Sequence, residues 1–206
     1  MTLRTYRTYG FIRLLLLSLM FPWGGLCGGR EEVLAKGWTL DLLIERYNQD
    51  EKAVLALDQG RPPSENWGGG GPDFGRLIGM VEKLGDRAAL PFLEEKSLMT
   101  NAPGTLRSRA AIAYVGVADV GESVNLMRKL YDDPSLRPRY YYISKFFLQK
   151  VKSEEKSLTD EVKSDICTHL LAIVQNTDSA GDALDAEFFL RDFLPGYTNS
   201  KQRATL

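Results

Sequence analysis

Histidine and cysteine are almost absent from this sequence, which contains one histidine and two cysteines among 206 residues. A protein zinc site draws mainly on histidine nitrogen and cysteine sulfur, so the chain holds too few such ligands for one. The single histidine, His169, would also have to serve any Ser-His-acid or Cys-His catalytic set, and no Gly-x-Ser-x-Gly motif is present. We therefore expect no metal, no cofactor and no catalysis. We interpret His169 as a structural residue that faces solvent or is held by a hydrogen bond; an enzyme that depends on it is the catalytic alternative.

Strand patterns are also missing. No stretch of four or more residues alternates cleanly between polar and apolar side chains with turn signals on both sides. The composition, with 44% hydrophobic and 26% charged residues, excludes a disordered, collagen-like or disulfide-dense chain. Four glycines at residues 68–71 lack the Lys-Ser/Thr pair of a P-loop, so they do not indicate a nucleotide site. The sequence therefore predicts an all-α fold.

Acidic residues are absent from residues 1–28, which carry Arg4, Arg7 and Arg13. A short apolar run follows these arginines, and a proline and several glycines come after it. This order predicts a secretory signal peptide over residues 1–28. The run has about 8 residues, against roughly 20 for a membrane-spanning helix. We expect an exported protein, periplasmic or secreted, with an uncleaved N-terminal membrane anchor as the alternative.

Cys27 lies where bacterial lipoproteins carry their lipid-modified cysteine, but Leu26 before it is larger than the residue usual there. We favour a plain cysteine in the cleavage region over lipidation. Cleavage would leave Cys167 as the only cysteine, without a disulfide partner in the chain, and its apolar neighbours predict that it is buried. Loss of residues 1–27 removes three arginines and no acid, so the net charge changes from −1 to about −4 and disfavours nucleic-acid binding.

The remaining chain divides by its glycine, proline and hydrophobic patterns. We expect an N-terminal helical segment at 29–58, a Gly/Pro-rich loop at 59–72, a helical-repeat domain at 73–196 and a polar tail at 197–206. The loop is the clearest interruption, because no helix tolerates two adjacent prolines followed by four glycines.

Two stretches of the repeat domain read as the same helix-turn-helix unit. One covers residues 74–98 and the other residues 106–130. Their turns carry Asp86 and Asp119, which lie 33 residues apart. A helical pair that repeats at this period is typical of an α-solenoid, in which each pair stacks on the next.

Helix boundaries are marked by capping residues along the whole domain. Asp73 precedes the first helix of the domain, and Gly85 closes it. Asp119 with Glu122 resembles a capping box, Asp133 precedes a proline suited to a first helical position, and Ser179 opens the last helix. The domain therefore consists of helices joined by short turns.

These residues resemble a known family. Residues 84–93, Leu-Gly-Asp-Arg-Ala-Ala-Leu-Pro-Phe-Leu, are similar to the turn and second helix of bacterial HEAT-like repeats, and residues 107–114 are similar to their first helix. Asn125 departs from the proline expected in the second copy. The resemblance covers residues 74–131 and extends weakly over 135–176, where three consecutive tyrosines replace small residues. It implies a short right-handed α-solenoid of antiparallel helix pairs and an interaction scaffold, without fixing a ligand.

An aromatic and basic stretch at 137–147 is the best candidate for a binding surface. Tyr140, Ile143, Phe147 and Val151 share one helical face, which predicts that they belong to the core. The residues beside that face combine tyrosine with basic side chains, as protein interfaces do. They are Arg137, Arg139, Tyr141, Tyr142 and Lys145. Core packing explains much of the stretch, and a partner-binding patch is the alternative.

The sequence favours an exported, non-catalytic helical-repeat protein that acts as a protein-binding scaffold. Its partner is an unknown protein, and contact with a membrane would occur only through the N-terminus or a lipid on Cys27. The alternative is a periplasmic inhibitor or immunity-type protein that blocks one enzyme or toxin, since the acidic net charge suits a basic partner.

Overall fold

The computed structural model describes residues 26–58 and 73–192, and throughout these residues the ordered elements are helices, with no strand. The all-α prediction is therefore confirmed. The chain divides into two compact units, and the boundary along the chain lies between Thr39 and Leu40. This division falls inside the segment 29–58. The predictions for the start of the signal peptide, the loop at 59–72 and the tail at 197–206 lie outside the described residues.

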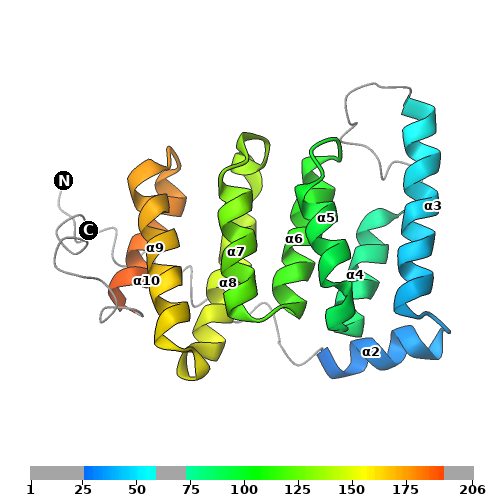
Figure 1. Ribbon diagram of the computed structural model, residues 1–206, viewed down its shortest axis with the longest axis horizontal. Coiled ribbons are helices and arrows are strands. Elements are labelled where there is room, and N and C mark those ends of the chain that lie inside the picture. The colour runs from blue at the N-terminus through cyan, green and yellow to red at the C-terminus, as the bar shows by residue number, and fades with distance from the viewer. Residues whose placement is uncertain (1–25, 59–72, 193–206) are drawn as a thin grey trace. The chain divides into compact units, whose positions relative to one another are not determined.

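The first unit contributes one described helix, α2. The second contributes eight α-helices and three short 3₁₀ turns among the described residues. Figure 1 labels the α-helices in chain order. The described elements of both units are α2 Leu26–Ala35, α3 Leu40–Asp58, α4 Phe74–Leu84, η2 Arg87–Ala89, α5 Leu90–Leu98, α6 Gly104–Val117, α7 Val120–Tyr131, η3 Pro134–Leu136, α8 Arg137–Glu154, η4 Glu155–Ser157, α9 Asp160–Asn176 and α10 Ala180–Asp192.

The predicted capping residues begin and end these helices. The Asp73 carboxylate accepts the backbone N–H of Arg76 at the start of α4. Gly85 ends α4 with φ of 63°, a left-handed conformation that favours glycine. Asp119 and Glu122 form both hydrogen bonds of a capping box at the start of α7. Side-chain caps of this kind let one helix begin within a few residues of the end of the preceding one, as α7 does after α6.

The helices of the second unit pack in two rows. Helices α4, α6, α8 and α10 contact one another in that order, and α5, α7 and α9 do the same. The rows are joined by contacts of α5 with α6, α7 with α8 and α9 with α10, and α3 packs against α4. The buried side chains of α6, among them Ala110, Ala111 and Tyr114, come from several sides of the helix, as expected for a helix with neighbours in both rows.

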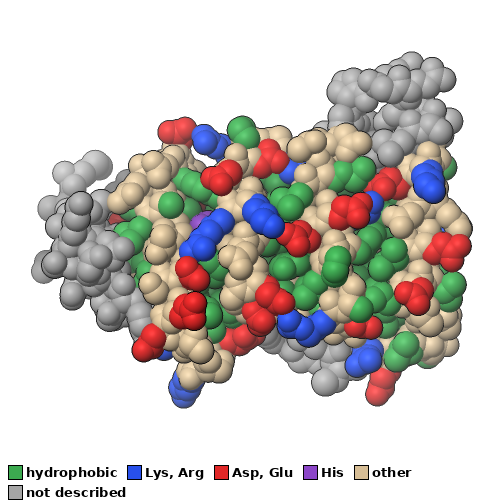
Figure 2. All heavy atoms as spheres, viewed as in Figure 1, with side chains coloured by type: hydrophobic (Ala, Val, Ile, Leu, Met, Phe, Trp, Pro, Cys, Tyr) green, Lys and Arg blue, Asp and Glu red, His purple; other side chains and the backbone are tan. Residues whose placement is uncertain are grey.

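Contacts of the continuous segment η2–α5 with α7 recur at a constant separation along the chain. Arg87 donates to Glu122 and Lys129 donates to Glu94, each at 2.7 Å and each between residues 35 positions apart. A constant separation is what two helices running in the same direction give. Figure 2 shows basic and acidic side chains close together on the face that carries α5, α7 and α9. This face therefore carries several ion pairs between neighbouring helices.

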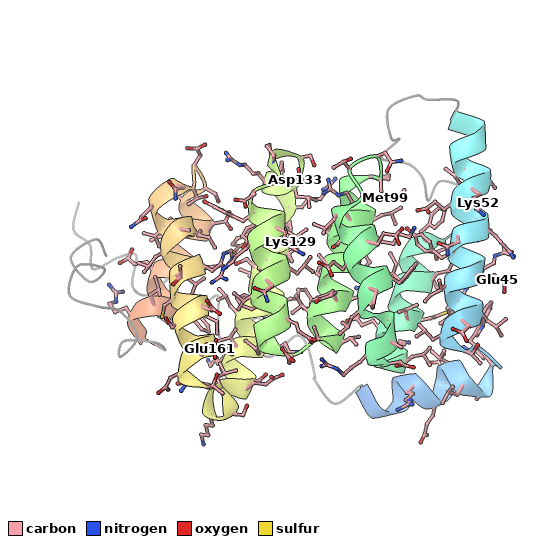
Figure 3. All side chains as sticks on the ribbon, viewed as in Figure 1. Glu45, Lys52, Met99, Lys129, Asp133 and Glu161 are labelled. Atoms are coloured by element: carbon pink, nitrogen blue, oxygen red, sulfur yellow. The ribbon has the colours of Figure 1, made fainter. Side chains whose placement is uncertain are left out.

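Two basic side chains of the second unit are buried and bind helix ends. The Arg107 guanidinium, which is 1% exposed, donates to the Ser97 carbonyl near the end of α5, to Ser135 Oγ and to the Asp133 carboxylate. Figure 3 shows Asp133 and Met99, which follow α7 and α5, at the same end of these helices. Lys150 Nζ donates to the carbonyls of Val115, at 2.8 Å, and Ala118 at the end of α6. Both cations satisfy carbonyls that a helix end leaves unpaired.

Candidate functional site

Helix α8 carries the predicted binding patch and packs its opposite face into the core. The buried side chains include Tyr140, Ile143, Phe147 and Val151, so the prediction for this face is confirmed. Asp133 caps η3, which leads directly into α8. The predicted patch residues therefore lie beside or opposite a fixed core face.

One edge of α8 follows the start of α10. Arg137 NH1 lies 3.8 Å from Asp178 Oδ2, just before α10. The Tyr141 ring lies against Gly181, where an added Cβ would sit 3.6 Å from a ring carbon. Lys145 Nζ lies 4.3 Å from the centroid of the Tyr141 ring, and its charge opposes the rise that burial causes in the pKa of Asp185. Arg137, Tyr141 and Lys145 are thus brought together along one edge of α8.

Tyr142 adds an exposed aromatic ring next to this edge. Its side chain is 62% exposed, and its ring centroid lies 5.7 Å from that of Tyr141. Phe146, one turn later, and Leu184 on α10 are exposed as well. We call Tyr141, Tyr142, Lys145, Phe146 and Leu184 the α8–α10 face.

Arg139 lies apart from the other patch residues. Its side chain covers Gly104 at the start of α6, where an added Cβ would sit 2.9 Å from the guanidinium Nε. Arg139 therefore faces the start of α6, whereas Arg137 faces the segment just before α10. The structure groups four of the five predicted residues and separates this one.

A cleft of about 280 Å³ opens beside the first turn of α8. It lies where the end of α7, the start of α8 and the link between α9 and α10 meet. We call it the Tyr131–Asp182 cleft. Its lining is Tyr131, Arg137, Pro138, Tyr140, Asn176, Thr177, Asp178, Ser179 and Asp182. The sequence identifies Arg137 as a candidate site residue but does not predict the rest of the cleft, because its residues come from separate segments and form no binding motif.

Asp182 is the most deeply placed charged residue of this cleft. Its side chain is 6% exposed, and Oδ1 has no hydrogen-bond partner among the described residues. Burial raises the pKa of its carboxyl group, a hydrogen bond with Ser179 lowers it, and the nearby Asp185 charge raises it again. Only the Ser179-x-x-Asp182 pattern of a helix start marks this residue in the sequence.

His169 lies behind the cleft in the core. Its Nε2 is 2.7 Å from the Tyr140 hydroxyl, and both side chains are buried. Burial, and then the nearby Arg128 charge, lower the pKa of His169 to about 4, so the imidazole is neutral at neutral pH. Nε2 can then accept a hydrogen bond from the Tyr140 hydroxyl group. The hydrogen-bonded interpretation of His169 is confirmed and the solvent-facing one is wrong.

Cys167 is buried, as predicted, and burial raises the pKa of its thiol to about 11. A thiol with so high a pKa is protonated at neutral pH and is a poor nucleophile. In the described part of the chain, no three His, Cys, Asp or Glu side chains are grouped so that they could hold a metal ion. None of the helices within residues 26–58 and 73–192 combines the length and apolar character needed to span a membrane.

Comparison with known proteins gives this chain no relatives: no family model matches it, and no curated protein or solved structure is significantly similar.

Proposed function

We propose that this chain is an exported, non-catalytic helical-repeat protein that acts as a scaffold for a partner protein. In this proposal, helices α3 to α10 form a short right-handed α-solenoid of antiparallel, HEAT-like helix pairs. The observation that carries it is the pair of contacts of η2 and α5 with α7 at one constant separation of 35 residues. Stacked repeats produce such contacts, because the second helices of neighbouring units lie side by side and run in the same direction.

The α8–α10 face is the proposed partner-binding surface. Five large apolar side chains are exposed among the described residues, and three of them, Tyr142, Phe146 and Leu184, belong to this face. The face carrying α5, α7 and α9 instead has charged side chains paired with one another. Aromatic and apolar anchors surrounded by polar groups are typical of interface centres, whereas exposed ion pairs contribute little to binding.

Site-specific photo-cross-linking in the native host tests this surface. Tyr142→p-benzoylphenylalanine places the reactive group on the α8–α10 face, and Leu42→p-benzoylphenylalanine places it on a comparably exposed apolar position of α3. We expect one major cross-linked protein from position 142 and none from position 42. Equal cross-linking from both positions, or none from position 142, would contradict the assignment.

The export part of the proposal rests on the basic and apolar pattern of residues 1–28. Cell fractionation with N-terminal sequencing tests it. We expect the mature protein outside the cytoplasm, beginning close to Cys27. Recovery from the cytoplasm with residues 1–27 retained would overturn this part alone.

The acidic charge of the mature chain supports a second candidate, an inhibitor or immunity-type protein that blocks one basic enzyme or toxin. The stoichiometry of the cross-linked complex and the activity of the bound partner separate the two. A basic partner at one copy per chain whose activity falls on binding supports the inhibitor, and a partner whose activity is unchanged supports the scaffold.

A further inference from the structure

The Tyr131–Asp182 cleft carries one more acidic than basic side chain. Its lining includes Arg137, Asp178 and Asp182. Arg137 and Asp178 lie at the opening, since both side chains are largely exposed, and their 3.8 Å separation makes them a loose pair. Asp182 lies deeper and has no such neighbour among the residues described. The excess negative charge is therefore concentrated inside the cleft.

The local hydrogen bonds leave one oxygen of Asp182 without a donor. The Tyr140 hydroxyl is bound to His169 Nε2, and the Tyr131 hydroxyl is directed to the Ala172 carbonyl at 3.5 Å. Oδ1 of Asp182 is buried without a partner in the described part of the chain. Buried carboxylate oxygens in folded proteins are almost always hydrogen-bonded, because leaving one without a donor costs free energy. This oxygen is therefore a binding position for a donor brought by a ligand.

Aromatic rings form the walls beside this oxygen. Tyr131 and Tyr140 both line the cleft, with ring centroids 5.3 Å apart and planes inclined at 64°. The faces of tyrosine rings attract cations, and more strongly when water is excluded. An aromatic wall next to an unpartnered carboxylate oxygen favours a positively charged ligand with an apolar stem.

The volume of the cleft and the number of its free acceptors restrict the kind of cation that it can bind. At about 280 Å³, the cleft is smaller than the roughly 300–1,000 Å³ typical of pockets for drug-sized molecules. It suits one side chain. A guanidinium group binds best to both oxygens of a carboxylate, whereas an ammonium group is a point charge that one oxygen can satisfy. Oδ1 of Asp182 is a single buried oxygen without a partner in the described part of the chain, and a single acceptor of this kind favours the ammonium group.

We propose that the Tyr131–Asp182 cleft binds the primary ammonium group of a lysine side chain on the partner protein. This inference rests on the proposed scaffold function and adds the chemistry of one contact to it. The cleft and the α8–α10 face share the α8 edge that begins at Arg137, so one partner can reach both.

Titration of the full chain, followed by its amide NMR signals, tests the cleft directly. The probes are Nα-acetyl-lysine methylamide and its norleucine analogue, which has a similar stem without the ammonium group. We expect saturable shifts at Tyr131, Ser179 and Asp182 with the lysine probe and none with the norleucine probe. Equal shifts with both probes, or none with lysine, would overturn the proposal.

Two matched variants locate the charge that binds. Asp182→Asn is nearly isosteric and removes the deep charge, and Asp178→Asn removes the exposed one. We expect the dissociation constant of the lysine probe to rise by about tenfold or more in Asp182→Asn and by less than about threefold in Asp178→Asn. The reverse order, or no change in Asp182→Asn, would contradict the assignment. An unchanged amide spectrum away from the cleft confirms that the variant is folded, and Tyr131→Leu, which removes one aromatic wall, is expected to weaken binding as well.

Two further experiments distinguish a lysine side chain from a free amine as the ligand, and failure of the cleft proposal from failure of the scaffold proposal. If n-butylammonium binds as tightly as the lysine probe, and the cross-linked partner is retained equally by wild type and Asp182→Asn, the cleft serves a free amine and the lysine assignment is wrong. Loss of the partner in Asp182→Asn, with retention in Asp178→Asn, supports it. Absence of any cross-linked partner in wild type overturns the scaffold proposal, while the probe titration still decides the ammonium chemistry.

Discussion

The central helices α5 to α7 and the later helices α8 to α10 use charged residues in different ways. In the central region, Arg107 is almost completely buried and donates to three acceptors on neighbouring segments. In the later region, Asp182 is buried to a similar degree, and one of its oxygens has no donor among the described residues. Buried polar groups that serve only the fold are normally satisfied within it, and the proposed ligand contact rests on this difference.

Exposed apolar residues follow the same division. The surface of the central helices is covered by charged pairs such as Arg87 with Glu122, whereas Tyr142, Phe146 and Leu184 are exposed on α8 and α10. The region that matches the repeat pattern best is therefore the one committed to structure. The region where the pattern weakens is the one that carries the proposed binding surface.

The largest effect expected on the central region comes from Arg107→Met. The variant leaves the Ser97 carbonyl and the Asp133 carboxylate without their buried donor, and we expect the free energy of unfolding to fall by about 4 kcal/mol. Urea unfolding followed by circular dichroism measures this change. The control is Arg137→Met, whose exposed pair with Asp178 should contribute less than about 0.5 kcal/mol. Similar losses of unfolding free energy in the two variants would contradict the difference described between the two regions.

The buried His169 makes the later region sensitive to acid. Its folded pKa of about 4 lies below the ordinary value of 6.5, so the unfolded chain binds a proton more readily between these values. This contribution to stability is complete above about pH 6.5 and is lost as the pH falls toward 4; it amounts to roughly 3 kcal/mol.

Unfolding free energies of wild type and His169→Gln across this pH range isolate the histidine. Glutamine can still accept a hydrogen bond from the Tyr140 hydroxyl group and does not titrate. We therefore expect the unfolding free energy of His169→Gln to fall less steeply with acid than that of wild type. Identical slopes for the two proteins would show that folding does not lower the pKa of His169.

A smaller effect is expected at the turn that precedes α7. Asp119→Ala removes the capping box of α7, and we expect a loss of about 1 kcal/mol, measured by thermal unfolding. Asn at this position can still cap the helix, so Asp119→Asn should restore most of the stability. A loss of similar size in both variants would mean that charge, and not capping, is the cause.

The smallest effect concerns the ion pair that links α5 and α7. A double-mutant cycle with Glu94→Gln and Lys129→Gln should give a coupling energy of about 0.5 kcal/mol or less, because both side chains are partly solvated. Chemical denaturation of the four proteins measures it. A coupling above about 2 kcal/mol would mean that these pairs, and not the buried contacts, hold the stacked helices together.

The sequence predicts the local features of this fold and misses the contacts that join distant segments. Asp73, Gly85 and Asp119 are found because capping depends on neighbours within a few residues. The buried position of Arg107 is not found, since its acceptors come from two other turns and arginine is ordinarily exposed.

The candidate site is predicted only in part for the same reason. The spacing along α8 identifies Arg137, Tyr141, Tyr142 and Lys145, but it cannot show that Arg139 faces α6. Asp182 becomes recognisable only when α10 is packed beside α8 and its missing donor is visible.

The most direct test of the central claim is the affinity of the cross-linked partner for matched surface variants, measured by isothermal titration calorimetry. The double variant Tyr142→Ser/Leu184→Ser alters the α8–α10 face, and Leu42→Ser alters an exposed apolar position on α3. The account predicts that the double variant weakens binding by about 30-fold or more, roughly 2 kcal/mol, and that Leu42→Ser changes it by less than about threefold. Wild-type affinity in the double variant, or an equal loss in Leu42→Ser, would contradict it.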